Sequence, residues 1–224
     1  MSPTSPANPS ALLFDLDGTL LDSVPDLAQA VDRMLRDLGF AEAGEERVRH
    51  WVGNGSRKLV QRALAHLRGV DEAEVAEADI DAPQQRFFHH YLQCCTERSR
   101  LYDGVMVALE RWAQRGVPMA CVTNKPARFT ELLLDHFDLR RLLPVAICGD
   151  TLPTRKPDPQ MLFRACELLG VEPAAAWMVG DSRNDVLAAR AAGMAAICVS
   201  YGYNHGRPVA EESPDRLLDS LADL

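Results

Sequence analysis

Ala11-Leu12-Leu13-Phe14-Asp15-Leu16-Asp17-Gly18-Thr19 is the stretch that decides the fold of this chain. Its apolar run predicts a buried strand, and that strand ends in two carboxylates one residue apart. Residues two apart in a strand point the same way, and a bend after Asp15 also brings Asp17 beside it. Two like charges so close need a divalent cation or a shared proton. The stretch therefore indicates metal chemistry or acid/base chemistry at a strand end.

Polar side chains also follow two later strands. Met119-Ala120-Cys121-Val122 leads into Thr123-Asn124-Lys125, and Ala176-Trp177-Met178-Val179 leads into Gly180-Asp181-Ser182-Arg183-Asn184-Asp185, while Lys156-Pro157-Asp158-Pro159 stands between them. In an open parallel sheet, ligands bind beyond the carboxyl ends of the strands. We therefore expect these side chains to converge with Asp15 and Asp17 despite their separation in sequence.

The hydrophobic pattern predicts an α/β fold with one interruption. From about Asp22 to Arg100 apolar residues recur at spacings of three and four, as in Leu27, Val31 and Met34, which indicates helices only. After residue 104 helix and strand alternate, which implies a parallel sheet covered on both faces. Predicted helices end at Arg115 and span 127–137, 159–169 and 184–192, and predicted strands lie at 119–122, 145–148, around Trp177 and at 195–199.

This pattern predicts a Rossmann-like parallel sheet core with an inserted all-helical cap. The predicted boundaries are a disordered N-terminal arm at 1–10, a core formed by 11–21 and 101–224, and a helical cap at 22–100. The arm has neither the basic region nor the apolar run of a signal peptide, and no stretch is long enough to span a bilayer.

Composition limits the partners. A chain of 224 residues with 47% hydrophobic content can bury a sizeable core. The formal net charge of -8 and the isoelectric point of about 5.2 argue against nucleic acid or an anionic membrane as the main partner. A site that binds phosphate in such a chain needs local cations.

The six cysteines predict reduced thiols and a cytoplasmic protein, because they fall in apolar strand-like or helical runs and no CxxC occurs. His89-His90 and Cys94-Cys95 have helical spacing that could ligate zinc. Adjacent residues point to different faces of a helix, however, and no second half of a zinc site is visible.

Asp15/Asp17, Thr123, Lys156 and Asp181/Asp185 form four motifs in a fixed order that resemble the haloacid dehalogenase superfamily of phosphotransferases. The resemblance covers almost the whole chain after the arm and indicates the subgroup with a helical cap between its first two motifs. It is closest to the bacterial phosphoglycolate phosphatase family, through three segments: Phe14-Asp15-Leu16-Asp17-Gly18-Thr19-Leu20-Leu21-Asp22-Ser23, Trp51-Val52-Gly53-Asn54-Gly55 and Tyr201-Gly202-Tyr203-Asn204.

The resemblance implies a Mg²⁺-dependent phosphomonoesterase that hydrolyses 2-phosphoglycolate through an aspartyl-phosphate, as a monomer or homodimer acting on a small molecule. Asp15 is then the nucleophile and Asp17 the general acid and base. Asp15, Asp181 and the Asp17 carbonyl hold Mg²⁺. The remaining roles are phosphoryl binding by Thr123 and the Asn124 N–H group, charge compensation by Lys156, and orientation of Lys156 or metal-bound water by Asp185.

Substrate choice is expected to come from the helical cap. Gly53-Asn54-Gly55 precedes a helix that begins near Ser56 and carries two cations, Arg57 and Lys58. Our hypothesis is that Asn54, Arg57 and Lys58 contact the carboxylate of a small phosphorylated acid; the alternative is a hinge-like turn with solvated side chains. Asp158 is expected to cap the following helix, and the role of Lys125 stays open.

Several other functions remain open. Another phosphatase substrate, such as a sugar phosphate or nucleotide, is the nearest, followed by a phosphosugar mutase and by a non-catalytic module that binds phosphorylated ligands. The related dehalogenases and phosphonatases lack the second aspartate of the first motif. Asp17 therefore favours chemistry at a P–O bond, although Lys58 could form an imine.

Overall fold

A computed structural model describes residues 8–224 of the chain. Residues 1–7, which make up most of the predicted disordered arm, lie outside the described residues. Just before the first strand, the backbone N–H of Ser10 donates to the carbonyl oxygen of Ala175 at 2.7 Å.

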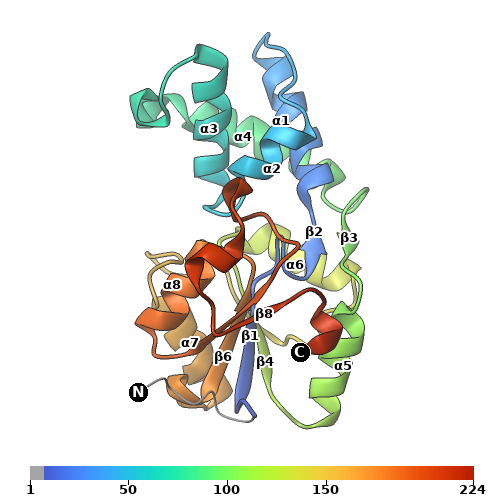
Figure 1. Ribbon diagram of the computed structural model, residues 1–224. Helices are drawn as coiled ribbons and strands as arrows, with labels where there is room; N and C mark the ends of the chain where they lie inside the picture. Colours follow the sequence, from blue (N-terminus) through green and yellow to red (C-terminus); the bar gives the residue numbers. More distant parts are fainter. Residues whose placement is uncertain (1–7) are drawn as a thin grey trace.

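A six-stranded parallel sheet, with strand order β5-β4-β1-β6-β7-β8, forms the centre of the core (Figure 1). Its strands are β1 (Ala11–Phe14), β4 (Met119–Val122), β5 (Val145–Ile147), β6 (Ala176–Gly180), β7 (Ala195–Val199) and β8 (Arg216–Leu218). β1 lies between β4 and β6, so that Phe14 pairs with Cys121 on one side and with Val179 on the other. These three central strands are buried along their whole length, as expected for a sheet with helices on both faces.

Four helices cover the sheet: α5 (Val105–Gln114), α6 (Ala127–His136), α7 (Gln160–Leu169) and α8 (Arg183–Ala191). Alternate residues of β1 face opposite layers. Leu12 and Phe14 belong to the apolar cluster that includes side chains of α5 and α6, whereas Leu13 belongs to the cluster that includes side chains of α7 and α8. This alternation follows from the two-residue period of a strand.

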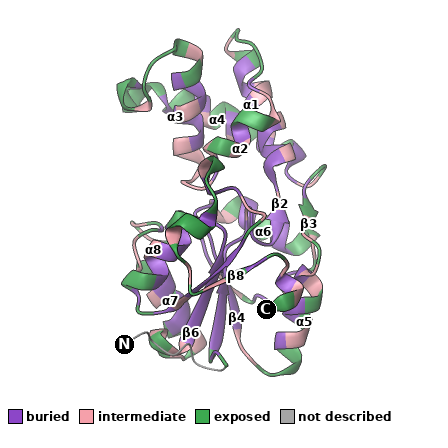
Figure 2. Cartoon of the chain, viewed as in Figure 1, coloured by how far each residue is buried: buried purple, intermediate pink, exposed green. Residues whose placement is uncertain are grey.

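The helical cap consists of α1 (Val24–Asp37), α2 (Glu45–Trp51), α3 (Ser56–Arg68) and α4 (Asp81–Cys94). Figure 1 shows these helices stacked beyond one edge of the core. Their inward faces, including Leu27, Val31 and Met34 of α1, form a separate apolar cluster, which Figure 2 shows as buried surfaces turned toward one another. The predicted α/β fold with an inserted helical cap is confirmed.

Short elements complete the fold. An antiparallel pair, β2 (Leu21–Asp22) and β3 (Arg100–Leu101), joins the helical cap to the core. The sequence did not predict this pair or β8: β2 and β3 have only two residues each, and β8 has an arginine within its three residues and one exposed leucine. The 3₁₀ helices are η1 (Glu72–Glu74), η2 (Glu77–Asp79), η3 (Pro173–Ala175), η4 (Asn204–Gly206), η5 (Val209–Glu212) and η6 (Leu221–Asp223).

Two local expectations can be compared with the structure. Asp158 Oδ1 accepts a hydrogen bond from the backbone N–H of Gln160, the first residue of α7, at 2.9 Å, but Pro159 and not Asp158 holds the N-cap position. All six cysteines are free and buried. No helix among residues 8–224 is long and apolar enough to cross a membrane.

The zinc alternative finds no support in the described part of the chain. His90 Nε2 lies 2.6 Å from Asp37 Oδ2, His89 contacts Gln93, and Cys94 and Cys95 are buried in the apolar cluster of the helical cap. These side chains therefore do not converge on a common point.

Candidate active site

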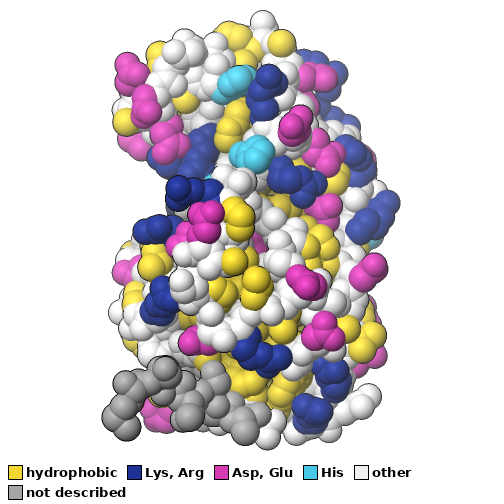
Figure 3. Space-filling model, in the orientation of Figure 1, with side chains coloured by type: hydrophobic (Ala, Val, Ile, Leu, Met, Phe, Trp, Pro, Cys, Tyr) yellow, Lys and Arg dark blue, Asp and Glu magenta, His cyan; other side chains and the backbone are white. Residues whose placement is uncertain are grey.

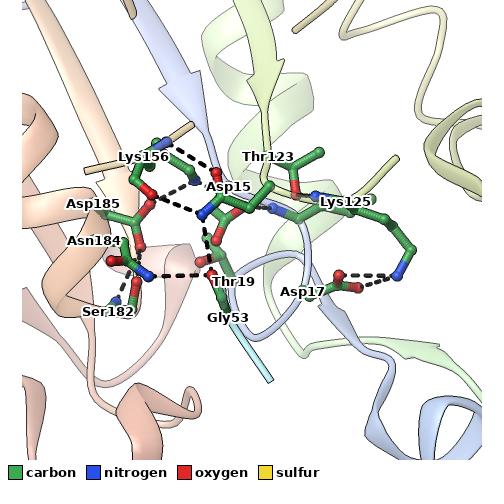
Figure 4. A network of polar contacts seen from close by, with 12 residues as sticks. Asp15, Asp17, Thr19, Gly53, Thr123, Lys125, Lys156, Ser182, Asn184 and Asp185 are labelled. Carbon is green, nitrogen blue, oxygen red and sulfur yellow. Dashed lines mark hydrogen bonds and ion pairs between the residues drawn. The ribbon is translucent and has the colours of Figure 1, made fainter. Parts of the chain in front are cut away.

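The three central strands deliver the predicted site residues to one edge of the sheet. Asp15 directly follows β1, Thr123 directly follows β4, and Asp181 directly follows β6. Since carboxyl ends of adjacent parallel strands share an edge, their side chains meet although up to 166 residues of sequence separate them. Figure 4 shows Asp15 between two groups of side chains, with Lys156 and Asp185 on one side and Asp17 with Lys125 on the other.

Lys156 is held by two carboxylates. Its Nζ lies 3.0 Å from Asp15 Oδ1 and 2.7 Å from Asp185 Oδ1, and all three side chains are buried. Burial lowers the pKa of Lys156, but the charges of Asp15 and Asp185 outweigh this effect and leave it above its ordinary value. Asp185 therefore contacts Lys156 directly, as one of the two roles predicted for it requires.

Asp185 is itself fixed by the start of α8. The hydroxyl and the backbone N–H of Ser182 donate to Asp185 Oδ2 at 2.6 and 3.1 Å, a capping box in which the acid lies three residues after the N-cap. Both oxygens of Asp185 are therefore engaged by donors of the protein.

Asp15, Asp181 and Asp185 form the one group of potential metal ligands found among residues 8–224, with oxygens within 4.8 Å of one another. Burial raises the pKa of Asp15 to about 6, against the lowering effect of Lys156. Burial, followed by the charges of Asp185 and Asp15, raises the pKa of Asp181 well above its ordinary value. Three buried carboxylates beside a single ammonium group leave excess negative charge, and a hard divalent cation with oxygen ligands would neutralise it.

Asp181 is positioned by the loops around it. Thr19 Oγ1 donates to its Oδ1 at 3.0 Å, and the backbone N–H of Tyr203 donates to its Oδ2 at 2.7 Å. Gly18 makes the approach possible: its φ is +89°, and a Cβ at this position would lie 2.3 Å from Asp181 Oδ2.

A cavity of about 490 Å³, including its open mouth, lies where the helical cap meets this edge of the sheet. The core residues lining it are Asp15, Asp17, Thr123, Asn124, Lys125, Pro126 and Phe129; those of the helical cap are Leu27, Val52, Gly53, Gly55, Ser56, Leu59, Phe87 and Tyr91.

On the outer surface, Figure 3 shows charged side chains of both signs interspersed over the face in view.

Asp17 forms its own ion pair, separate from that of Asp15. Its two carboxylate oxygens each lie 2.9 Å from Lys125 Nζ, and Ser23 Oγ donates to Oδ1 at 2.5 Å (Figure 4 shows the Lys125 contacts). Lys125 Nζ also lies 4.8 Å from the centroid of the Tyr91 ring. Lys125, whose role the sequence left open, therefore joins the second acid of the first motif to the helical cap.

The three cap side chains predicted to touch substrate do not line the cavity. Asn54 Oδ1 accepts a hydrogen bond from Arg62, while Arg57 pairs with Glu77 and Asp81, and Lys58 contacts Gln61 and Glu72. Only their neighbours Gly53, Gly55 and Ser56 reach the cavity. This difference has a geometric reason, because the start of α3 approaches the core with one face and turns its cations toward acids of the helical cap.

Sequence reasoning assigned no role to two further residues at the junction of core and helical cap, Asn184 and Tyr91. The Nδ2 groups of Asn124 and Asn184 donate to the carbonyl oxygen of Gly53 at 3.1 and 3.2 Å, so two core amides hold one peptide group of the helical cap. Asn184 stood within a quoted motif without a role. Tyr91 lines the cavity from α4, and only its place in a helical pattern was visible in the sequence.

Comparison with known proteins agrees with the family resemblance noted in the sequence. The family model of haloacid dehalogenase-like hydrolases matches residues 9–193. "Phosphoglycolate phosphatase 1" of Pseudomonas aeruginosa is 48% identical over 216 residues, covering 96% of this chain and 78% of the relative. "Phosphoglycolate phosphatase" of Psychrobacter arcticus is 44% identical over 213 residues, covering 95% and 93%. A crystal structure described as a predicted phosphoglycolate phosphatase from Haemophilus somnus superposes with a TM-score of 0.89 at 36% identity, covering 96% of this chain and 95% of that one. The chain belongs to the haloacid dehalogenase-like hydrolase family.

Proposed function

We propose that this chain is a Mg²⁺-dependent phosphomonoesterase that hydrolyses 2-phosphoglycolate to glycolate and phosphate. The observation that carries the reaction class is that Asp15 and Asp17 line the same cavity, each paired with its own lysine. Two carboxylates in distinct settings suit a nucleophile and a separate proton donor. The substrate rests on the relatives, which are named phosphoglycolate phosphatase at 44% and 48% identity.

Asp15 is oriented for attack on phosphorus. Its Oδ1 accepts from the backbone N–H of Leu16 at 2.7 Å and lies 3.0 Å from Lys156 Nζ, which leaves Oδ2 as the attacking oxygen. In the proposed step a bond forms between Oδ2 and phosphorus, and the ester P–O bond breaks with its electron pair on the departing oxygen. The product is an aspartyl-phosphate, which divides hydrolysis into two displacements.

Asp17 is proposed to give a proton to the departing oxygen and then to take one from the attacking water. Such general acid and base steps contribute about 10²–10⁴-fold each. Lys125 and Ser23 hold the carboxylate in place. Thr123 and the Asn124 N–H group are proposed to bind phosphoryl oxygens, and Lys156 to compensate the charge that develops on them.

The proposed Mg²⁺ ligands are Asp15, Asp181 and the backbone carbonyl of Asp17. Asp185 is proposed instead to orient Lys156, whose Nζ lies 2.7 Å from its Oδ1. The ion, when bound, supplies positive charge that lets a phosphate dianion approach a carboxylate.

The proposed setting is the cytoplasm, with a small phosphomonoester as the partner and a monomer or homodimer as the working form. Six free cysteines support a reducing compartment such as the cytoplasm. The net charge of -8 argues against nucleic acid or an anionic membrane as the partner. The proposed division into core and helical cap keeps the boundaries 11–21, 22–100 and 101–224.

Phosphate release tests the proposal. The substrates are 2-phosphoglycolate and a panel of sugar and nucleotide monophosphates, each with Mg²⁺ or with EDTA. We expect selective, Mg²⁺-dependent release from 2-phosphoglycolate, abolished in Asp15→Asn and retained in Asp103→Asn, which makes the same change at an exposed position. Release chiefly from sugar phosphates would contradict the substrate, and no release from any compound would favour a mutase or a binding module.

A further inference from the structure

The cavity holds a single cation for a second anionic group. Among the described residues that line it, Asp15, Asp17 and Lys125 carry charge, and Lys125 is the only cation. The helical cap contributes only uncharged side chains and backbone to the lining. A substrate with an acid at each end therefore finds Lys156 and the acidic metal cluster near its phosphate, and Lys125 as the counter-charge for its other end.

The hydroxyl group of Tyr91 is a second feature that points to a ligand. Tyr91 lines the cavity and is 1% exposed, and within residues 8–224 its hydroxyl has no hydrogen-bond partner. The ring is fixed by Phe87, with centroids 5.5 Å apart, and by Phe129 at 4.9 Å. Buried polar groups almost always have a partner, so an unpartnered hydroxyl on a residue that lines a cavity is a candidate donor to a ligand bound there.

Tyr91 is a donor rather than an anion at neutral pH. Burial, and then the charge of Asp17, raises the pKa of Tyr91 well above its ordinary value of 10. The hydroxyl therefore keeps its proton and can donate a hydrogen bond to an anionic oxygen.

The two donors come from different parts of the chain and meet beside Asp17. Lys125 follows β4 of the core and Tyr91 belongs to α4 of the helical cap, and the ammonium nitrogen lies 4.8 Å from the ring centroid. Lys125 Nζ is also 2.9 Å from both oxygens of Asp17, the proposed proton donor to the departing oxygen. In 2-phosphoglycolate a single methylene separates that oxygen from the carboxylate, so Lys125 is within reach of the carboxylate when Asp17 faces the departing oxygen.

We infer that Lys125 and the Tyr91 hydroxyl bind the acidic group of the substrate remote from its phosphate, and so select phosphorylated acids over uncharged phosphomonoesters. The inference rests on the proposed function and deepens it. It also replaces Arg57 and Lys58, whose side chains are paired with acids outside the cavity. Because α4 carries one of the two donors, the contact forms only when the helical cap lies over the core.

The test compares two substrates that differ only in the acid. 2-Phosphoglycolate and ethyl phosphate share the ester and the two-carbon chain, and the second has a methyl group in place of the carboxylate. The measured quantity is the ratio of kcat/KM for the two compounds at saturating Mg²⁺, for wild type, Tyr91→Phe and Lys125→Met. Tyr91→Phe removes no hydrogen bond from the described structure, so its fold is expected to survive, and a melting curve checks both variants.

Tyr91→Phe should lower kcat/KM for 2-phosphoglycolate about tenfold or more, the effect of one hydrogen bond to a charged group, and leave ethyl phosphate within about twofold. Lys125→Met should slow turnover of both substrates, because it also removes a contact of Asp17. In addition, the ratio of kcat/KM for 2-phosphoglycolate to that for ethyl phosphate should be about tenfold or more lower than in wild type. Lys58→Met removes the same charge outside the cavity and should keep the ratio of the wild type.

The outcomes separate the inference from the proposed function. A selective wild type whose ratio survives in both Tyr91→Phe and Lys125→Met overturns the inference alone, as does a ratio that collapses in Lys58→Met instead. Equal losses on both substrates in Lys125→Met, with Tyr91→Phe unchanged, also overturn it, since Lys125 then acts only through Asp17. A wild type with no preference for 2-phosphoglycolate contradicts the proposed function and the inference together.

Discussion

The side-chain amide of Asn124 forms two hydrogen bonds with the backbone of Lys156. Its Nδ2 donates to the Lys156 carbonyl oxygen at 3.0 Å, and its Oδ1 accepts from the Lys156 N–H at 3.0 Å. The same Nδ2 also donates to Gly53 of the helical cap. One buried amide therefore sets the loop that carries the buried lysine and contacts the part of the chain that covers the cavity.

Asn124→Ala should misplace Lys156. The variant loses both hydrogen bonds to the lysine backbone and leaves buried backbone groups unpaired, which should lower the free energy of unfolding by about 1–3 kcal/mol. A displaced cation should also reduce kcat, by about 10²-fold. Urea titration and steady-state kinetics measure the two effects. Asn124→Asp keeps the acceptor but places a carboxylate oxygen against the carbonyl oxygens of Gly53 and Lys156, so it should lose at least as much as Asn124→Ala. An unchanged kcat in Asn124→Ala would refute the positioning role.

Asn184→Ala should weaken closure of the helical cap while leaving the ion pairs of the site in place. The side chain is 7% exposed and contributes one hydrogen bond, 3.2 Å long, to the Gly53 carbonyl. We expect KM to rise about fivefold, the effect of one hydrogen bond of about 1 kcal/mol, and amide exchange near residues 52–56 to accelerate. Arg183→Ala, at the exposed neighbouring position, is the control. Exchange as slow as in wild type would show that Asn184 does not hold the helical cap.

The acidic cluster should make stability depend on pH in the metal-free protein. The pKa of Asp15 is raised to about 6 and that of Asp181 is raised well above its ordinary value, so the folded state binds these protons more tightly than the unfolded chain. Their stabilising contribution is therefore present below the unfolded pKa of about 4; the contribution of Asp15 is lost as the pH rises through about 6, and that of Asp181 as the pH rises through its own raised pKa. In EDTA, Asp181→Asn should gain stability relative to wild type as the pH increases from 4 to 8. Parallel urea midpoints for the two proteins across this range would contradict the assignment.

Addition of a divalent cation should reverse that loss. Metal ligands must be deprotonated, so binding becomes stronger over the same pH range in which the empty cluster destabilises the fold. The rise in melting temperature on adding Mg²⁺ should therefore be larger at pH 7.5 than at pH 5, and should disappear in Asp181→Asn. A shift of equal size at both pH values would indicate that the ion binds elsewhere.

Gly202→Ala should disturb the same cluster by steric contact alone. A Cβ at this position would lie 2.1 Å from the Cβ of Asp181, so one of the two segments must move. We expect a loss of about 1–3 kcal/mol in stability together with a weaker Mg²⁺-dependent thermal shift. Gly193→Ala is the comparison, because its φ of +71° costs about 1 kcal/mol in strain but no atom lies within 4 Å of the new Cβ. A normal metal response in Gly202→Ala would mean that Asp181 tolerates the displacement.

Most of the core and its catalytic edge could be predicted because their determinants are local. The apolar runs of β4 and β7 end where the sequence places them, and the helix of 127–137 differs from α6 by a single residue. Asp15, Thr123 and Asp181 converge because each directly follows a strand of one parallel sheet, whatever the length of chain between them. The apolar periods and the parallel sheet implied by the alternation of helix and strand were sufficient to place them at one edge.

The contacts of the helical cap could not be predicted in the same way. Its helices were predicted from their period, yet the predicted contacts of Arg57 and Lys58 with substrate depended on how α3 is rotated about its axis. That rotation results from the packing of one apolar cluster and from the pairing of these cations with Glu77, Asp81 and Glu72, all of which lie later in the chain.

The sequence by itself determined the α/β fold, the inserted helical cap and the set of acids and lysines that follow the strands. Only the tertiary structure decided that Lys125 pairs with Asp17, that the Tyr91 ring lies beside the same ammonium group, and that Asn124 and Asn184 share the Gly53 carbonyl. The physical reason is that strand ends are ordered by local hydrogen bonding within a sheet, whereas contacts between the helical cap and the core depend on the relative placement of two separate apolar clusters, which no periodicity in the sequence records.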